Sequence, residues 1–238
     1  EVIRALNLLR ISTLCTGRTG VRPEVAQCYA KLLNAGITPI VHEFGSLGCS
    51  GDLAPLAHSA LVLLGEGRAR TKDGKEITGA EACSLAGFEP IELKEKEGLA
   101  LINGTDGMLG QLCLAIDDIR RLVTTVDIAT AMSLEGLNGT ATVFAADLQE
   151  LRPHPGQAVA AANVLKVVEG SGILEAAAED FAINQVQDAY SVRCSPQVAG
   201  GVRDTLSHAI FVANNELAAA VDNPVVAKDG RVTSNGNF

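Results

Sequence analysis

The sequence predicts a mainly α-helical protein, a bundle built around long helices with small β-hairpins as decorations. Apolar residues recur at spacings of three and four along most of the chain, which is the period of an amphipathic helix. Hydrophobic residues make up 47% of the chain, yet aromatic residues make up only 3% and tryptophan is absent. The core must therefore be packed mainly from Ala, Val, Leu and Ile, which suits closely packed helices.

The first half of the chain combines short helices with one hairpin. Helices are expected over three segments, 1–16, 23–35 and 53–64. The third helix has Asp52 as a favourable N-cap and Gly65 as its stop. Between residues 68 and 79 the pattern changes to a short hairpin that turns at Asp73-Gly74. Residues 88–105 look irregular.

The second half of the chain is dominated by two long helices. Helical spacing runs from Asp106 to about Leu134 and again from Pro196 to Val221. Each helix would be roughly 40 Å long at the usual rise per residue. Shorter helices are expected over 140–149 and 156–170, and a second hairpin over 225–232.

Residues 1–238 are expected to form a single helical unit, because no repeat or low-complexity linker divides them. The chain opens without methionine, already inside a helical pattern, and stops on Phe238 just after Ser-Asn-Gly-Asn. We therefore expect it to be the central part of a longer chain.

Composition excludes several classes of partner. The net charge of −9 argues against nucleic acid and against an anionic membrane surface. The densest apolar run, Ala60 to Leu64, is far too short to span a membrane. Six cysteines are scattered without a CxxC pair, which indicates reduced thiols in a cytoplasmic protein. Four dispersed histidines without an HExxH motif predict no metal site.

The most reactive feature of the sequence is the tripeptide Cys49-Ser50-Gly51. The amide nitrogen of Gly51 can attack the carbonyl carbon of Cys49 and close a five-membered ring, because glycine lets backbone approach backbone closely. Loss of one water from the ring and one from the Ser50 side chain leaves a 4-methylidene-imidazol-5-one, an electrophile. A helix N-terminus at Asp52 would stabilise negative charge that develops on such a ring. The structural alternative is a glycine-rich turn that caps a helix.

Other chemistries fit this segment poorly. A serine-hydrolase elbow needs Gly-x-Ser-x-Gly, and Asp52 occupies the last position. His58 lies six residues beyond Asp52, so the two are not neighbours on a helix face. Gly45, Gly48 and Gly51 do not form a GxGxxG fingerprint, and no phosphate-binding lysine follows them, so no nucleotide cofactor is expected.

The segment GSLGCSGDLAPLAHSALVLLGEG at 45–67 resembles the cofactor-forming segment of the histidine and aromatic amino-acid ammonia-lyases, and most of all that of bacterial histidine ammonia-lyases. Five further segments resemble the family in the same order: LINGTDGML at 101–109, RPHPGQ at 152–157, VQDAYSVRCSPQV at 186–198, AAVDNPVV at 219–226 and SNGNF at 234–238. The family usually has alanine where Cys49 stands. Only the backbone carbonyl of that residue reacts, so the departure does not block cyclisation.

The resemblance implies a carbon-nitrogen lyase that converts L-histidine to trans-urocanate and ammonia through the methylidene-imidazolone formed from Cys49-Ser50-Gly51. Addition of the substrate amine to the methylidene carbon makes the amine a better leaving group, and a general base removes the β-proton. The family relationship also implies a homotetramer with sites shared between subunits. The base and the residues that read the substrate side chain would lie before Glu1 or after Phe238, so residues 1–238 alone are expected to be inactive.

The resemblance assigns roles to five further residues. Asn103 would hydrogen-bond the cofactor or the substrate amine, and Tyr190 would lie near the ring and assist cofactor formation or elimination. Arg193 would bind the substrate carboxylate, a role that guanidinium geometry fits, and Gln187 would extend that polar network. Phe238 would pack against the cofactor. Taken singly and without the resemblance, each residue is better read structurally, in the same order as a loop cap, a core phenol, a surface charge, a helix-face amide and a core ring.

Two alternatives stay open at this point, and a third is excluded. A phenylalanine or tyrosine ammonia-lyase, or an aminomutase, would use the same ring on another amino acid. A helical scaffold without catalytic activity would leave the tripeptide unmodified. The fumarase and aspartase group shares long helices and lyase chemistry, but its Gly-Ser-Ser loop with Met-Pro and Lys has no counterpart here.

Overall fold

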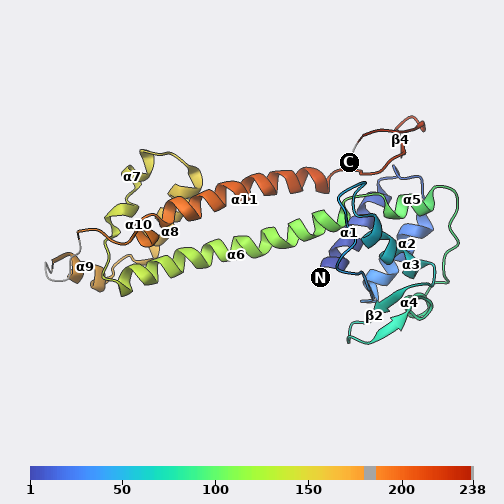
Figure 1. Cartoon of the computed structure of the whole chain (residues 1–238), viewed down its shortest axis with the longest axis horizontal. Helices are drawn as coiled ribbons and strands as arrows, with labels where there is room; N and C mark the ends of the chain where they lie inside the picture. The colour runs from blue at the N-terminus through green and yellow to red at the C-terminus, as the bar shows by residue number, and fades with distance from the viewer. Residues whose placement is uncertain (180–185, 237–238) are drawn as a thin grey trace. The chain divides into compact units, whose positions relative to one another are not determined.

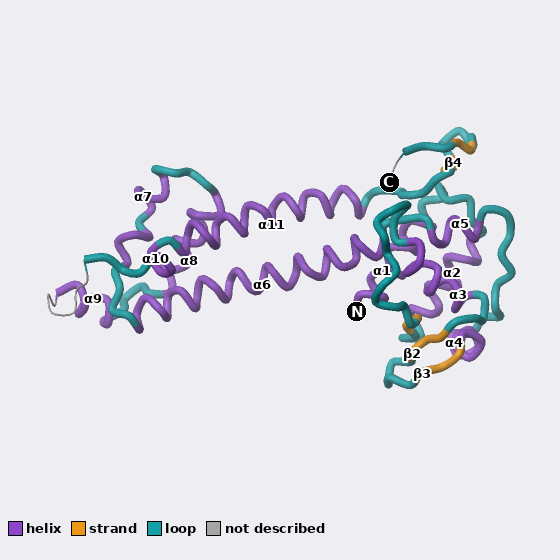
Figure 2. Tube along the Cα trace, in the orientation of Figure 1, coloured by secondary structure: helices purple, strands orange, loops and turns teal. Residues whose placement is uncertain are grey.

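A computed structural model describes residues 1–179 and 186–236, and it confirms the mainly α-helical class (Figures 1 and 2). Eleven α-helices and five short strands lie within the described ranges. The chain divides into two compact units, where the sequence predicts a single one. Unit 1 comprises residues 1–114 and 213–238, and unit 2 comprises residues 115–212.

The three helices predicted in the first half are confirmed, each to within two residues: α1 (Val2–Cys15), α2 (Pro23–Asn34) and α3 (Leu53–Leu63). Two further helices of unit 1 were not predicted, α4 (Gly79–Ala86) and α5 (Glu97–Ile102). Helix α4 begins with a capping box in which Thr78 and Glu81 bond each other's backbone N–H. The Thr-x-x-Glu spacing is the sequence signal for this start. Helix α5 falls inside the segment expected to be irregular.

Unit 1 is built around an aliphatic core, as the composition predicts. Helices α2 and α3 supply most of it, and Val25, Leu32 and Val62 are fully buried. Tyr29 is a rare ring in this core, and its burial raises the pKa of the phenol to about 12.

Two small antiparallel sheets decorate unit 1, as predicted. In the first, β2 (Arg68–Arg70) pairs with β3 (Glu76–Thr78), and β1 (Thr38–Pro39) adds a third strand beside β2. The turn at Asp73-Gly74 is confirmed, with Gly74 at φ +89°. The second sheet is the hairpin of β4 (Val225–Val226) and β5 (Val232–Thr233).

The two long helices are confirmed as α6 (Asp106–Gly136) and α11 (Ser195–Leu217), and each has residues in both units. Unit 2 also contains a 3-10 helix and four short helices: η1 (Ala141–Phe144), α7 (Ala146–Glu150), α8 (Pro155–Val167), α9 (Gly172–Glu179) and α10 (Tyr190–Arg193). The single helix expected over 140–149 is broken at Ala145, whose ψ of 142° is extended. Helices α9 and α10 were not predicted.

Unit 2 has a small buried core around Leu134, Phe144 and Val164, and close backbone packing and a buried ion pair add to it. A Cβ added at Gly156 of α8 would lie 2.3 Å from the carbonyl oxygen of Gly200 in α11, so only glycine allows this approach. Arg203 of α11 donates to the carbonyl oxygen of Val123 in α6 at 3.0 Å and pairs with Asp127 of the same helix.

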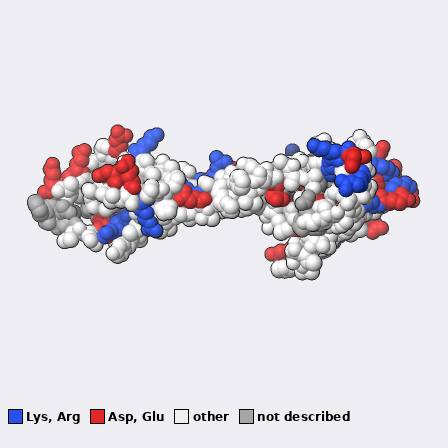
Figure 3. Space-filling view, turned by 90° about the horizontal axis from the view of Figure 1, so that it is seen from above, with Lys and Arg blue, Asp and Glu red and all other residues white. Residues whose placement is uncertain are grey.

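Charged side chains of both signs are interspersed on the surface facing the viewer in Figure 3. Among the described helices, none is long and apolar enough to cross a membrane.

The buried carboxylate of Glu97 makes the stability of unit 1 depend on pH. It accepts hydrogen bonds from the Arg22 guanidinium (2.8 Å) and from the Arg22 and Lys94 backbone N–H groups (3.1 and 2.8 Å), and the Arg22 bond lowers the pKa of Glu97 to about 2. A lowered pKa stabilises the fold above the unfolded value of 4.5, and this contribution is lost as pH falls from there towards 2.

We therefore expect Glu97→Gln to lower the free energy of unfolding by about 1–3 kcal/mol near neutral pH, at about 1.4 kcal/mol per pKa unit. The difference from wild type should vanish near pH 2. Urea denaturation across this range measures it. Glu76→Gln is the control, because its ion pair with Arg68 is solvent-exposed and contributes little. A difference that does not change with pH would contradict the assignment.

Candidate active site

The tripeptide Cys49-Ser50-Gly51 lies in the loop between β1 and α3, at a sharp bend. Ser50 and Gly51 both have left-handed backbones, with φ values of +58° and +77°, and Gly48 before them has a φ of +68°. A left-handed conformation is uncommon for any residue other than glycine, so Ser50 is held in a strained state by its surroundings. Cys49 and Ser50 are exposed, whereas Gly51 is buried.

The buried end of the tripeptide is joined to the turn between α5 and α6. Gly51 forms a parallel bridge with Gly104, and the backbone N–H of Asp52 donates to the Gly104 carbonyl oxygen at 2.7 Å. One end of the bend is therefore fixed to the fold, and the reactive Ser50 side chain is left accessible. This backbone fits a methylidene-imidazolone, because ring closure needs a tight bend with a glycine as its third residue.

Asp52 is placed as predicted at the start of α3, but its side chain does not cap that helix. Its Oδ2 atom accepts the backbone N–H of Met108 at 2.9 Å, in the first turn of α6, and its Oδ1 atom accepts the Ser46 hydroxyl at 2.8 Å. The carboxylate thus satisfies one of the unpaired N–H groups at the start of a different helix. Asp52 is 2% exposed, so it holds the tripeptide loop and α6 together from inside.

A fully buried arginine supports the same turn from behind. Arg10 of α1 donates to the Asn103 carbonyl oxygen at 3.0 Å and pairs with Asp106 at 3.3 Å. Thr13 donates to the other oxygen of Asp106 at 3.3 Å. Burial raises the pKa of Asp106, although the Arg10 charge opposes this shift.

Asn103 is one residue from the bridge to the tripeptide, and it is 4% exposed. Its Nδ2 atom donates to Asp222 Oδ1 at 3.1 Å and to the Asn223 carbonyl oxygen at 3.0 Å. Lys96 pairs with the second oxygen of Asp222. The predicted bond from Asn103 to the cofactor or the substrate amine stays a prediction, and Asp222 and Lys96 are partners that the sequence reasoning did not identify.

Tyr190 and Arg193 lie together on the short helix α10 of unit 2. The Arg193 guanidinium carbon is 4.9 Å from the centre of the Tyr190 ring, a cation–π contact. Tyr190 is 72% exposed, so it is not the buried core phenol of the structural alternative. Gln187, just before this helix, is also exposed. Phe238 lies outside the described residues.

The sequence contains signals for two of the three supporting residues that the sequence reasoning missed, Arg10 and Asp222. Arg10 falls in the apolar stripe of α1, between the buried Leu6 and Leu14, and a charge in such a stripe needs a buried partner. Asp222 lies in the AAVDNPVV segment that carries the family resemblance. The sequence gives no signal for Lys96, because its left-handed backbone at φ +69° is seen only in the structure.

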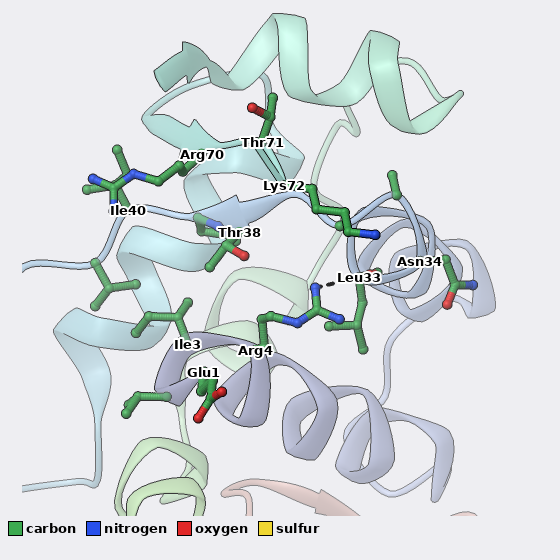
Figure 4. A pocket seen from close by; sticks show the side chains of 15 residues that line it. Glu1, Ile3, Arg4, Leu33, Asn34, Thr38, Ile40, Arg70, Thr71 and Lys72 are labelled. Atoms are coloured by element: carbon green, nitrogen blue, oxygen red, sulfur yellow. Dashed lines mark hydrogen bonds between the residues drawn. The ribbon is translucent and has the colours of Figure 1, made fainter. Parts of the chain in front are cut away.

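A separate open cavity of about 820 Å³ lies between the start of α1, the end of α2 and the strands β1 and β2 (Figure 4). Arg4 and Lys72 point into it, and Arg4 donates to the Leu33 carbonyl oxygen at 3.3 Å. None of the three residues of the tripeptide lines this cavity, although Ile40 and Val41, at the start of the loop that carries the tripeptide, do. Across the described residues, no group of His, Cys, Asp or Glu side chains is arranged to hold a metal ion.

The sequence and the fold are those of a known lyase family. The sequence model of the family described as aromatic amino acid lyase matches residues 1–238, so the chain belongs to this family. Histidine ammonia-lyase from Streptomyces coelicolor is 60% identical over 238 residues, all of this chain and 46% of that protein. A tyrosine ammonia-lyase from Cupriavidus metallidurans is 42% identical, over all of this chain and 48% of that protein.

Solved structures show the same fold. Phenylalanine aminomutase from Pantoea agglomerans superposes with a TM-score of 0.89 at 37% identity, over 100% of this chain and 48% of that one. Histidine ammonia-lyase from Trypanosoma cruzi superposes with a TM-score of 0.86 at 36% identity, over 99% of this chain and 43% of that one. The chain thus spans about half the length of the relatives it matches.

The close approach at Gly104 gives a test of the turn that supports the tripeptide. A Cβ there would lie 2.6 Å from Asp106 Oδ2 and 2.7 Å from Arg10 Nη1. We expect Gly104→Ala to cost about 1–3 kcal/mol of unfolding free energy through overpacking. The control is Gly201→Ala in α11, where a Cβ meets nothing within 4 Å and the change should stabilise by about 0.5–1 kcal/mol. Equal effects of the two substitutions in urea denaturation would contradict the packing argument.

Proposed function

We propose that this chain carries the electrophile-forming part of an ammonia-lyase that releases ammonia from L-histidine and leaves trans-urocanate. The observation that carries the proposal is the left-handed bend at Ser50 and Gly51, anchored to Gly104, in a chain 60% identical to proteins named histidine ammonia-lyase. The reaction needs an electrophile, and the tripeptide is the part of the chain whose backbone is shaped to supply one.

Ring formation is proposed to use the backbone of Cys49-Ser50-Gly51 alone. A bond forms between the Gly51 nitrogen and the Cys49 carbonyl carbon, and two molecules of water leave, one of them with the Ser50 hydroxyl. Once formed, the ring would supply an electrophilic methylidene carbon, and Cys49, Ser50 and Gly51 are the residues that would hold it in the chain. The fixed end at Gly51 and Asp52 supports ring closure, because it pre-organises the bend that cyclisation needs.

The remaining site residues are proposed to bind and orient the substrate. Arg193 offers a planar, two-pronged donor for the carboxylate, with Gln187 as a neighbouring polar group. Tyr190, exposed at the start of α10, is available to assist cofactor formation or elimination. Asn103 is proposed to hydrogen-bond the substrate amine. Phe238 is proposed to shield the ring, by family resemblance.

The 238 residues are proposed to be catalytically incomplete on their own. They span 46% of the histidine ammonia-lyases they match, so the general base and the residues that read the substrate side chain are proposed to lie elsewhere in a longer chain. That protein is proposed to be a cytoplasmic homotetramer; the six cysteines are unpaired in the structure, which accords with a reducing compartment.

A related lyase or an aminomutase is the second candidate. Its support is the similarity to a tyrosine ammonia-lyase at 42% identity and to a phenylalanine aminomutase at a TM-score of 0.89. Ammonia release by the full-length protein from L-histidine, compared with L-phenylalanine and L-tyrosine, separates the candidates. Formation of a β-amino acid without net release of ammonia would favour the aminomutase.

Intact-protein mass tests the tripeptide directly. The full-length protein should be lighter than its sequence by two molecules of water, and Ser50→Ala should restore the unmodified backbone mass and abolish ammonia release. Cys49→Ala is the matched control and should keep the modification, because only the backbone carbonyl of residue 49 reacts. An unmodified wild-type mass would favour a scaffold without catalytic activity.

Assay of residues 1–238 alone tests the claim of incompleteness. No urocanate absorbance should develop from L-histidine, whereas the full-length protein should produce it under the same conditions. Urocanate formed by the 238-residue chain would contradict the claim.

A further inference from the structure

The side-chain amide of Asn103 is only half satisfied. Both N–H groups of Nδ2 are directed at acceptors, Asp222 Oδ1 and the Asn223 carbonyl oxygen. Among the described residues, no donor lies within hydrogen-bonding distance of Asn103 Oδ1. Asn103 is 4% exposed as a residue, and its Oδ1 atom is not among the fully buried unpaired atoms of the described residues, so this oxygen remains accessible to a donor from a ligand or water.

The orientation of this amide is determined by its neighbours. A carboxylate oxygen and a backbone carbonyl oxygen can only accept hydrogen bonds, so the Asn103 nitrogen must face them. If the amide turned over, its oxygen would face two acceptors. The oxygen is therefore the atom left to face other partners.

Asp222 is the residue that enforces this orientation. Its side chain is fully buried, and its Oδ1 atom also accepts the Asn223 backbone N–H at 2.7 Å. Lys96 neutralises the carboxylate from a left-handed backbone at φ +69°, a conformation that is unfavourable for lysine. Asn103 and Asp222 are 119 residues apart in sequence, and both belong to unit 1.

We propose that Asp222 is a positioning residue that holds the Asn103 amide so that Oδ1 accepts an N–H of the substrate amine. The inference rests on the proposed function and extends it to a residue that does not itself contact substrate. The substrate amine carries N–H groups and therefore donates hydrogen bonds. If the Asn103 amide were turned over, its Nδ2 donor would face the amine, and two donors would be placed against each other. The orientation therefore selects for the amine-bearing end of an amino acid.

Three variants separate the hydrogen bond from the ion pair. Asp222→Leu removes the acceptor and leaves the Asn223 N–H unpaired, so Asn103 Oδ1 can turn inward to accept it. Asp222→Asn loses the charge but keeps an acceptor oxygen for Asn103 and Asn223, and the partly exposed Lys96 can swing into solvent. Lys96→Met removes the ion pair and leaves both oxygens of Asp222 in place.

The first readout is the Asn103 side-chain amide in a ¹H–¹⁵N TROSY spectrum of the full-length protein, assigned by its loss in Asn103→Leu. Its two protons should exchange slowly in wild type, Asp222→Asn and Lys96→Met, and faster by about tenfold or more in Asp222→Leu, as expected for a lost buried hydrogen bond. If Asp222→Asn and Lys96→Met are as disturbed as Asp222→Leu, the ion pair and not the acceptor positions Asn103, and the inference is overturned.

The second readout is binding by the full-length protein of L-histidine and of 3-(imidazol-4-yl)propanoate, which lacks only the amine. Asp222→Leu should weaken the binding of L-histidine by about 10- to 100-fold and leave the binding of the compound without the amine nearly unchanged. Equal weakening of both compounds would indicate a merely structural role and overturn the inference. Failure of the proposed function is distinguishable, because it appears in wild type as an unmodified mass and no ammonia release.

Discussion

The structure around the tripeptide depends on the double attachment of Asp52. Its backbone N–H is bound to the Gly104 carbonyl oxygen, and its carboxylate is bound to the first turn of α6 through the Met108 N–H. The first bond fixes where the tripeptide ends, and the second fixes the helix that follows the Gly104 turn. Both bonds act on one buried residue, so the buried end of the bend and the start of α6 are linked. A strained loop is thus maintained by a rigid scaffold.

The buried charges behind this attachment share one feature, which is that each is paired with a partner distant in sequence. Arg10 meets Asp106, and Lys96 meets Asp222. Removing one partner of such a pair leaves an uncompensated buried charge, so these pairs specify the arrangement even where they add little net stability. The raised pKa of Asp106 shows that desolvation outweighs the attraction of Arg10 there. The pairs therefore serve to position the turn at 103–106.

Local patterns in the sequence predict most of the helices of unit 1 and both hairpins, because spacing, caps and turn residues act over a few residues. They fail at α5, which is six residues long and begins after a left-handed Lys96, and at 140–149, where extended backbone at Ala145 divides one expected helix. In the site, motif reasoning identifies the tripeptide and Asn103. It cannot reveal that Asp52 caps α6 and not α3, because that choice depends on a partner 56 residues away.

Asn103 illustrates what tertiary structure adds to a family resemblance. The sequence leaves two roles for its amide, towards the cofactor or towards the substrate amine. An amide that donated to a ring oxygen would need a free N–H, and both are engaged by Asp222 and Asn223. Only the acceptor remains, and an acceptor suits an amine and not a carbonyl oxygen. Under the proposed function, neighbours more than a hundred residues away in the chain therefore favour the substrate amine as the partner of this side chain, because they engage its nitrogen.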